Sequence, residues 1–191
     1  MPVQKDPDSQ PQDNTSALRL ILPILFIVLI VTVAYLLYPM FAKNVGPQII
    51  LNIIKLRTES QTLSRSQLIT ETDDMVKSTK DRSLMGEWST LTQCLPQGCP
   101  DDDYLNFIGL VTQQMDIPNR DLIQNIIITY RYWGTDEIVR FSKAMTAVTR
   151  SIEDTYSRSL EEKWKGIIEC DGKCAEKNDL YFQAIEIAVE L

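Results

Sequence analysis

The chain has 191 residues, a formal net charge of −7, four cysteines and no histidine. The lack of histidine excludes Ser-His-Asp and Cys-His catalysis, and it excludes zinc, haem and di-iron sites that need imidazole ligands. The acidic balance, with 17 basic and 23 acidic residues from Lys43 onward, argues against nucleic acid and against anionic lipid surfaces as partners.

The N-terminal segment is polar and rich in proline. Residues 1–17 include Pro2, Pro7 and Pro11 and show no hydrophobic periodicity, which predicts a disordered tail. Asn14-Thr15-Ser16 matches the glycosylation acceptor pattern. If the tail is cytoplasmic, this match is accidental.

The next segment is strongly apolar. Leu20 to Tyr38 gives nineteen residues without a charge, flanked by Arg19 and Lys43. At a rise of about 1.5 Å per residue, a helix of this length spans the roughly 30 Å hydrocarbon core of a bilayer. We therefore expect a transmembrane helix over residues 18–42 that serves as an uncleaved signal-anchor. A buried core helix and a cleaved signal peptide are the alternatives, but the run is long for either and no small-residue cleavage site follows cleanly.

Residues 47–83 are predicted to form a helical stalk or linker. Isoleucine and leucine dominate Ile49 to Leu56, which indicates a helix leaving the membrane surface. Ten of the 27 residues from Arg57 to Ser83 are Ser or Thr, and the apolar positions are thinly spaced. A flexible linker is the alternative over this second part.

Residues 84–191 are predicted to form a helical domain. A first short helix ends near Pro96, and Asp101, Asp102 and Asp103 open the next one, where acidic groups suit the positive end of the helix dipole. We favour this role over calcium binding, because the glycine and the distal glutamate of a calcium loop are missing. After a break at Pro118, the run 126–133 favours helix over strand, because no partner strand is visible.

Two further helices complete the predicted domain. Apolar residues recur every 3.6 positions or so from Ile138 to Ile167, which predicts one helix over residues 135–169 with Thr135 as its N-cap and Gly166 as its weak point. We expect Asn178 to cap the last helix. The predicted fold class is therefore all-α, with a transmembrane helix, a stalk and a bundle of four or five helices. Its expected core includes Trp88, Phe107, Ile126, Phe141, Val148, Ile152, Leu160, Trp164 and Ile185.

The cysteines fall into two close pairs, Cys94 with Cys99 and Cys170 with Cys174. Short local pairs beyond an anchor predict two disulfides, each pinning a turn, and hence a domain in an oxidising compartment outside the cytoplasm. A long link between Cys94 and Cys170 would stabilise more, but loop geometry favours local bonds. A four-thiolate zinc site, which would require a cytoplasmic domain, and a thiol–disulfide enzyme are the alternatives, although neither spacing matches those motifs.

The sequence indicates a function only in outline. We expect a non-catalytic accessory subunit of a complex at the cell membrane, held in the lipid bilayer by residues 18–42. It would bind a protein partner or a second copy of the chain, without a cofactor. A ligand-sensing ectodomain that works with a partner signalling chain is the first alternative, and the cytoplasmic zinc domain is the second.

Overall fold

The computed structural model describes residues 28–29, 32, 45–58, 63–170 and 176–191. The chain divides into two units, Met1–Ala42 and Lys43–Leu191, and the fold below is that of the second. Among the described residues, no helix combines the length and the apolar character that a membrane span needs. The predicted tail and nearly all of the predicted span over 18–42 lie outside the described residues.

The described part of the second unit is entirely helical, which confirms the all-α prediction. It contains eight α-helices and one short 3-10 helix, and no strand occurs in the described ranges. The number of helices therefore exceeds the four or five predicted. The elements are α2 (Val45–Thr58), α3 (Leu63–Thr79), α4 (Arg82–Cys94), η1 (Leu95–Gln97), α5 (Asp101–Gln114), α6 (Arg120–Tyr132), α7 (Ile138–Thr155), α8 (Arg158–Glu169) and α9 (Lys177–Glu190).

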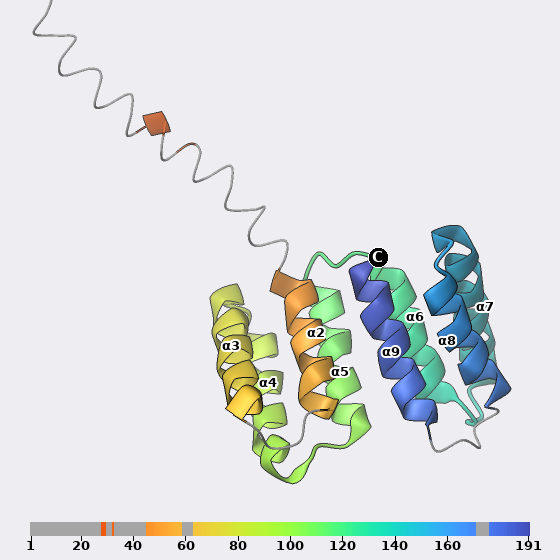
Figure 1. The fold of residues 1–191 in the computed structure, drawn as a ribbon, viewed down its shortest axis with the longest axis horizontal. Helices are drawn as coiled ribbons and strands as arrows, with labels where there is room; N and C mark the ends of the chain where they lie inside the picture. The colour runs from red at the N-terminus through yellow and green to blue at the C-terminus, as the bar shows by residue number, and fades with distance from the viewer. Residues whose placement is uncertain (1–27, 30–31, 33–44, 59–62, 171–175) are drawn as a thin grey trace, which may run out of the picture. The chain divides into compact units, whose positions relative to one another are not determined.

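The helices form two packed rows (Figure 1). One row runs α3, α2, α9, α8 and the other runs α4, α5, α6, α7, with each helix packed against its counterpart across the rows. Helix α9 lies between α2 and α8 within its row, so it packs both on α2 and on α8 of the α7–α8 pair.

The core lies between the two rows, and α2 is central to it. Ile49, Ile50, Ile53 and Leu56 are fully buried, and α2 packs on α3, α5 and α9. Most of the predicted stalk over residues 47–83 instead belongs to α2 and α3, which are helices of the second unit.

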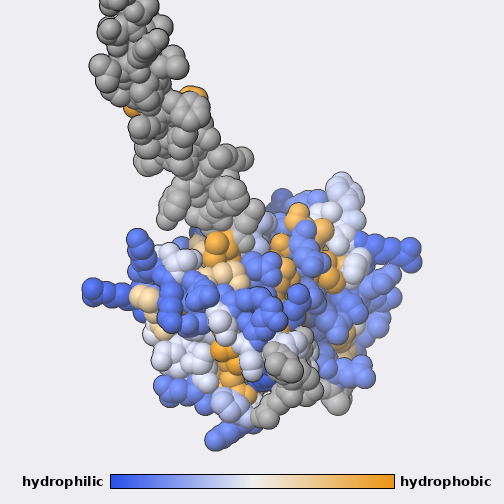
Figure 2. All heavy atoms as spheres, turned by 60° about the vertical axis from the view of Figure 1, so that its left-hand side comes forward, coloured by the Kyte–Doolittle hydropathy of each residue, from blue (hydrophilic) through white to orange (hydrophobic). Residues whose placement is uncertain are grey.

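The polar composition of α3 follows from its place at the end of its row. Among the described residues its main neighbours are α2 and α4, so most of its surface faces water. Figure 2 brings this side forward and shows mainly hydrophilic residues, with apolar ones in smaller separate areas. Its inward face is partly polar as well, since the Thr72 hydroxyl accepts a hydrogen bond from the Asn52 side chain of α2 at 3.2 Å, both groups being buried.

The predicted single helix over 135–169 is wrong, because the chain reverses after Thr155. Tyr156 adopts the left-handed conformation with φ of 52°, and the Ser157 hydroxyl caps α8 by accepting from the Leu160 amide at 3.4 Å. The apolar spacing runs on without a break because Ile152 and Leu160 both face the core on either side of the turn. Sequence periodicity therefore gave no sign of the reversal.

Most of the predicted core residues are buried: Trp88, Phe107, Ile126, Val148, Ile152, Leu160, Trp164 and Ile185 are each at most 6% exposed. Phe141 is half-buried, so its assignment to the core was only partly correct. The helix predicted over 126–133 is confirmed by α6, which ends at Tyr132.

The predicted N-caps are shifted. Glu137 rather than Thr135 precedes α7, and Glu176 rather than Asn178 precedes α9. In the first case the chain needs two more residues to turn after Gly134, which has φ of 73°. In the second, the Asn178 side chain is used in a contact with another helix, described below.

Tyr181 of α9 carries a buried hydroxyl that has no hydrogen-bond partner among the described residues. Burial raises the pKa of Tyr181, against a smaller lowering effect of the nearby Thr129 hydroxyl, which itself donates to the Ile126 carbonyl. An unpaired buried hydroxyl opposes folding by about 1 kcal/mol or more. Tyr181→Phe is therefore expected to raise the free energy of unfolding by about 1 kcal/mol in urea titrations. Tyr156→Phe, on an exposed ring, should leave it unchanged; a destabilised Tyr181→Phe protein would contradict the unpaired hydroxyl.

Candidate functional site

A groove separates α7 from α8. α7 packs mainly on α6 and α8 mainly on α9, so these two helices touch each other little although they follow one another in the chain. The groove has a volume of about 420 Å³ and is lined by Thr149, Ile152, Glu153, Tyr156, Ser157, Arg158, Glu161 and Trp164. The Trp164 indole donates to the Thr149 hydroxyl at 3.1 Å, which joins the two helices beside the groove that both residues line.

Tyr156 lies at the turn that closes this groove and is unusual in two ways. Its side chain is 93% exposed, and its backbone is left-handed, a conformation that strains a bulky residue by about 1 kcal/mol. Glycine or asparagine would relieve the strain, and an exposed ring adds nothing to the core. The tyrosine therefore contributes little to the stability of the unit, and we regard it as the leading candidate for a contact with another protein.

The first turn of α7 exposes two more apolar side chains. Ile138 is 70% exposed and Val139 68% exposed. Beside them, the rings of Trp133 and Phe141 meet edge to face with centroids 5.1 Å apart, and the Lys177 ammonium lies 4.1 Å from the Trp133 ring centre. Both ends of α7 thus present apolar or aromatic groups to solvent, as protein-binding surfaces do.

A second cluster of side chains joins the ends of three helices. Arg57 at the end of α2 donates through Nε to Asp101 Oδ1 at 2.6 Å and through Nη2 to Asp101 Oδ2 at 3.2 Å. Its Nη2 also lies 2.7 Å from Asp179 Oδ1, and its guanidinium lies 4.2 Å from the Phe182 ring centre. The Asn178 amide donates to Asp101 Oδ2 at 2.7 Å. We call Arg57, Asp101, Asn178 and Asp179 the Arg57 cluster.

The Arg57 cluster is a structural ion pair with a specific orientation. The Arg57 side chain is only 13% exposed and that of Asp101 21% exposed. Burial alone would lower the pKa of Arg57, but the hydrogen bonds and charges of Asp101 and Asp179 outweigh it and raise that pKa. All three helices are held at one end by this arginine.

The same cluster predicts a specific loss of stability in acid. Burial alone would raise the pKa of Asp101, but hydrogen bonds from Arg57 and Asn178 and the charge of Arg57 outweigh it and lower that pKa. A carboxyl of this kind stabilises the fold fully above its unfolded-state pKa of about 3.9, and this stabilisation is lost as pH falls through the lowered folded-state pKa.

Asp101→Asn should therefore lose less stability than the wild type between about pH 5 and pH 2. Urea titrations at several pH values across this window measure the difference in slope. Equal slopes for the two proteins would show that Asp101 does not contribute to acid denaturation. Asp102→Asn, on an exposed neighbour, is the matched control.

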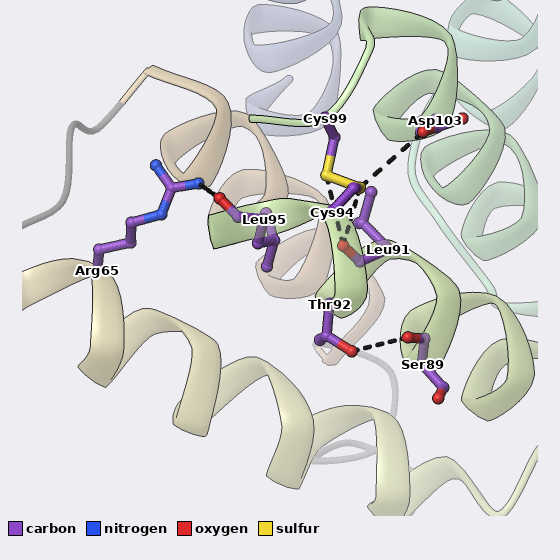
Figure 3. Close-up of a disulfide and its surroundings, with 8 residues drawn as sticks. All are labelled: Arg65, Ser89, Leu91, Thr92, Cys94, Leu95, Cys99 and Asp103. Atoms are coloured by element: carbon purple, nitrogen blue, oxygen red, sulfur yellow. Dashed lines mark hydrogen bonds between the residues drawn. A yellow bond between two sulfur atoms is a disulfide. The ribbon is translucent and has the colours of Figure 1, made fainter. Parts of the chain in front are cut away.

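The first predicted cysteine pair is bonded in the structure. Cys94 and Cys99 form a disulfide with their Cα atoms 5.0 Å apart (Figure 3). Their Sγ atoms lie 3.0 and 3.4 Å from the Leu91 carbonyl oxygen, and Cys94 Sγ lies 3.9 Å from Asp103 Oδ2. These are contacts rather than hydrogen bonds, because a disulfide sulfur carries no proton.

The second pair is only partly described. Cys170 is also disulfide-bonded, but its predicted partner Cys174 lies outside the described residues, so the bond between them stays a prediction. Bonded cysteines cannot act as thiolate ligands, which disfavours the four-thiolate zinc site. No group of three or more acidic or cysteine side chains that could hold a metal occurs in the part of the chain that the structure describes.

Asp101, Asp102 and Asp103 occupy the first turn of α5, as predicted from helix polarity. None of them is the N-cap residue, which is Pro100, and Asp101 instead binds Arg57.

Comparison of the chain with protein family models, curated proteins and solved structures finds no match in any of the three.

Proposed function

We propose that this chain is a single-pass membrane protein whose helical unit is a non-catalytic binding subunit outside the cytoplasm. The anchor is the apolar segment within residues 18–42, which in length and lack of charge meets the requirement for spanning a bilayer. The proposal for the anchor depends on the sequence alone.

The cysteines support the location. Cys94 and Cys99 are bonded to one another, and Cys170 is bonded as well. Structural disulfides persist in oxidising compartments and are rare where thiols are kept reduced. An anchor followed by a disulfide-bonded unit is the arrangement of a membrane protein whose C-terminal part has crossed the bilayer.

The observation that carries the binding role is Tyr156. Its exposed ring lines the α7–α8 groove together with Trp164 and Ile152, and it stands on a strained turn. Aromatic side chains that fill or border a pocket are the residues that dominate protein–protein binding energy. We assign the outer face of α7 and α8 to a protein partner that places a side chain between the two helices.

Site-specific photocrosslinking tests this proposal in native membranes. A photoreactive phenylalanine analogue at Tyr156 is expected to give a discrete adduct with a second polypeptide. The same analogue at Gln67, exposed on α3 in the other terminal helix pair, should give none. An adduct of twice the chain's mass would make the partner a second copy of the chain.

A variant separates binding from folding. Tyr156→Gly should remove the adducted partner from detergent-purified protein while leaving the unfolding midpoint equal or higher, because it relieves the backbone strain. No adduct at position 156, or adducts of equal strength at 156 and 67, would contradict the assignment.

A further inference from the structure

The connection between α4 and α5 is held by its disulfide together with the Leu95 side chain, which is buried in the core. After Cys94 the chain makes one 3-10 turn, passes through Gly98 with φ of 88°, and enters α5 at Asp101. Described hydrogen bonds also restrain it. The Gly98 amide donates to the Leu95 carbonyl at 3.3 Å, Arg65 of α3 donates to the same carbonyl at 2.8 Å (Figure 3), and the Asp103 amide donates to the Pro100 carbonyl at 3.0 Å. Pro100, the N-cap residue, makes no side-chain cap.

The disulfide lies very close in sequence to the Arg57 cluster. Asp101 follows Cys99 by two residues, and two residues span at most about 7 Å, so the position of Cys99 limits where the Asp101 backbone can lie. Asp101 in turn binds Arg57 of α2 and Asn178 of α9. Through Asp101, the position of Cys99 therefore constrains α2 and α9, and neither of these helices contains a cysteine among the described residues.

We propose that the Cys94–Cys99 disulfide is a redox-sensitive latch on the end of α2. When the bond is closed, it holds the first turn of α5 where Asp101 can bind Arg57 in two places. When it is open, the connection loosens, and the end of α2 separates from α5 and α9.

The chemistry needs a dithiol as reductant. One thiolate of the dithiol attacks a sulfur of the Cys94–Cys99 bond and forms a mixed disulfide, and its second thiol then displaces the remaining cysteine. Two electrons and two protons pass to Cys94 and Cys99, which become thiols, while the dithiol becomes a disulfide. The reverse exchange with an oxidised dithiol closes the latch. The proposal does not depend on the anchor or on the binding partner.

Coupling between two sites is reciprocal, so a change in the Arg57 cluster must change the ease of reducing the disulfide. Full-length protein in mild detergent is equilibrated with mixtures of reduced and oxidised dithiothreitol, quenched and alkylated. The mass of the peptide holding Cys94 and Cys99 then gives the fraction reduced. Arg57→Met is expected to lower the ratio of reduced to oxidised dithiothreitol at half-reduction by at least about fivefold.

Arg158→Met is the matched control. Its ion pair with Glu162 is exposed, and it is distant in sequence from the disulfide. It should leave the half-reduction ratio unchanged. If Arg57→Met and wild type are reduced at the same ratio, the latch does not exist and the disulfide acts only on its own turn.

Hydrogen exchange gives the second readout. Replacing Cys94 and Cys99 together by Ser should accelerate amide exchange at the end of α2 and in the first turn of α9, and should leave α7 unchanged. Acceleration confined to residues 91–104 would also overturn the proposal. The reduction measurement requires no cysteine variant, so it decides the question even if the double variant fails to fold.

Discussion

Replacing Arg57 by Met is expected to lower the free energy of unfolding by about 2–3 kcal/mol, which would make Arg57 one of the most important single side chains in the fold. The loss arises because Asp101 stays 21% exposed and negatively charged without its cation, while Asp179 loses the same partner. We place the effect below that of a fully buried pair, because Asp179 is 55% exposed and water can reach it. Equilibrium urea unfolding measures it.

Two further variants test this explanation. Arg158→Met removes an ion pair of similar length, 3.1 Å, in which Arg158 is 90% exposed, and should change stability by less than about 0.5 kcal/mol. Combining Arg57→Met with Asp101→Asn removes the stranded charge and should recover part of the loss. If Arg57→Met is no more harmful than Arg158→Met, the Arg57 cluster does not hold the helices together.

Gly46→Ala is expected to destabilise the fold by about 2 kcal/mol. A methyl group at Gly46, in the first turn of α2, would overlap the end of the Ile117 side chain and lie 3.2 Å from Cβ of Met115. Ile117 is buried in the core at 5% exposed, so moving its side chain to make room disturbs the packing around the loop that joins α5 to α6. Thermal and urea unfolding both report this change.

Gly86 provides the matched control for Gly46. It lies inside α4, is exposed, and has no atom within 4 Å of the position that a methyl group would take. Gly86→Ala should therefore raise the stability by about 0.5–1 kcal/mol through helix propensity alone. Opposite signs are expected for the two substitutions, and a stabilising Gly46→Ala would show that α2 and the α5–α6 loop are not in close contact.

The sequence predicted the helical class because hydrophobic periodicity is a local property. Leu84, Trp88 and Leu91 recur on one face of α4, and all three are buried. The same reasoning failed for α7 and α8, because a reversal at Tyr156 keeps both apolar stripes facing the core. It also failed for α3. This helix packs in the unit, but it stands at the end of its row, so its surface is mostly exposed and its sequence is as polar as that of a stalk.

Of the contacts at the candidate sites, the sequence predicts those between residues close in the chain and not those between residues far apart. Cys94 and Cys99 are five residues apart, so turn geometry alone could pair them. Arg57 and Asp101 are 44 residues apart, and nothing in their local sequence shows that the end of α2 meets the start of α5. Tyr156 falls in the apolar stripe predicted from Ile138 to Ile167, because its spacing matches that of the buried residues. Only the left-handed backbone at Tyr156 shows that its ring leaves the stripe.

The most direct test of the proposed membrane arrangement is glycosylation mapping in microsomes. Replacing Lys80 by Asn and Arg82 by Thr creates an acceptor at the exposed turn between α3 and α4, and Lys80 already has the left-handed conformation, with φ of 57°, that asparagine tolerates. Asp81, which caps α4, is kept. We expect the chain to remain with the membrane pellet after alkaline extraction and to gain one glycan that an endoglycosidase removes. A chain that stays unglycosylated while pelleting, or that is released by alkali, would contradict an anchored unit outside the cytoplasm.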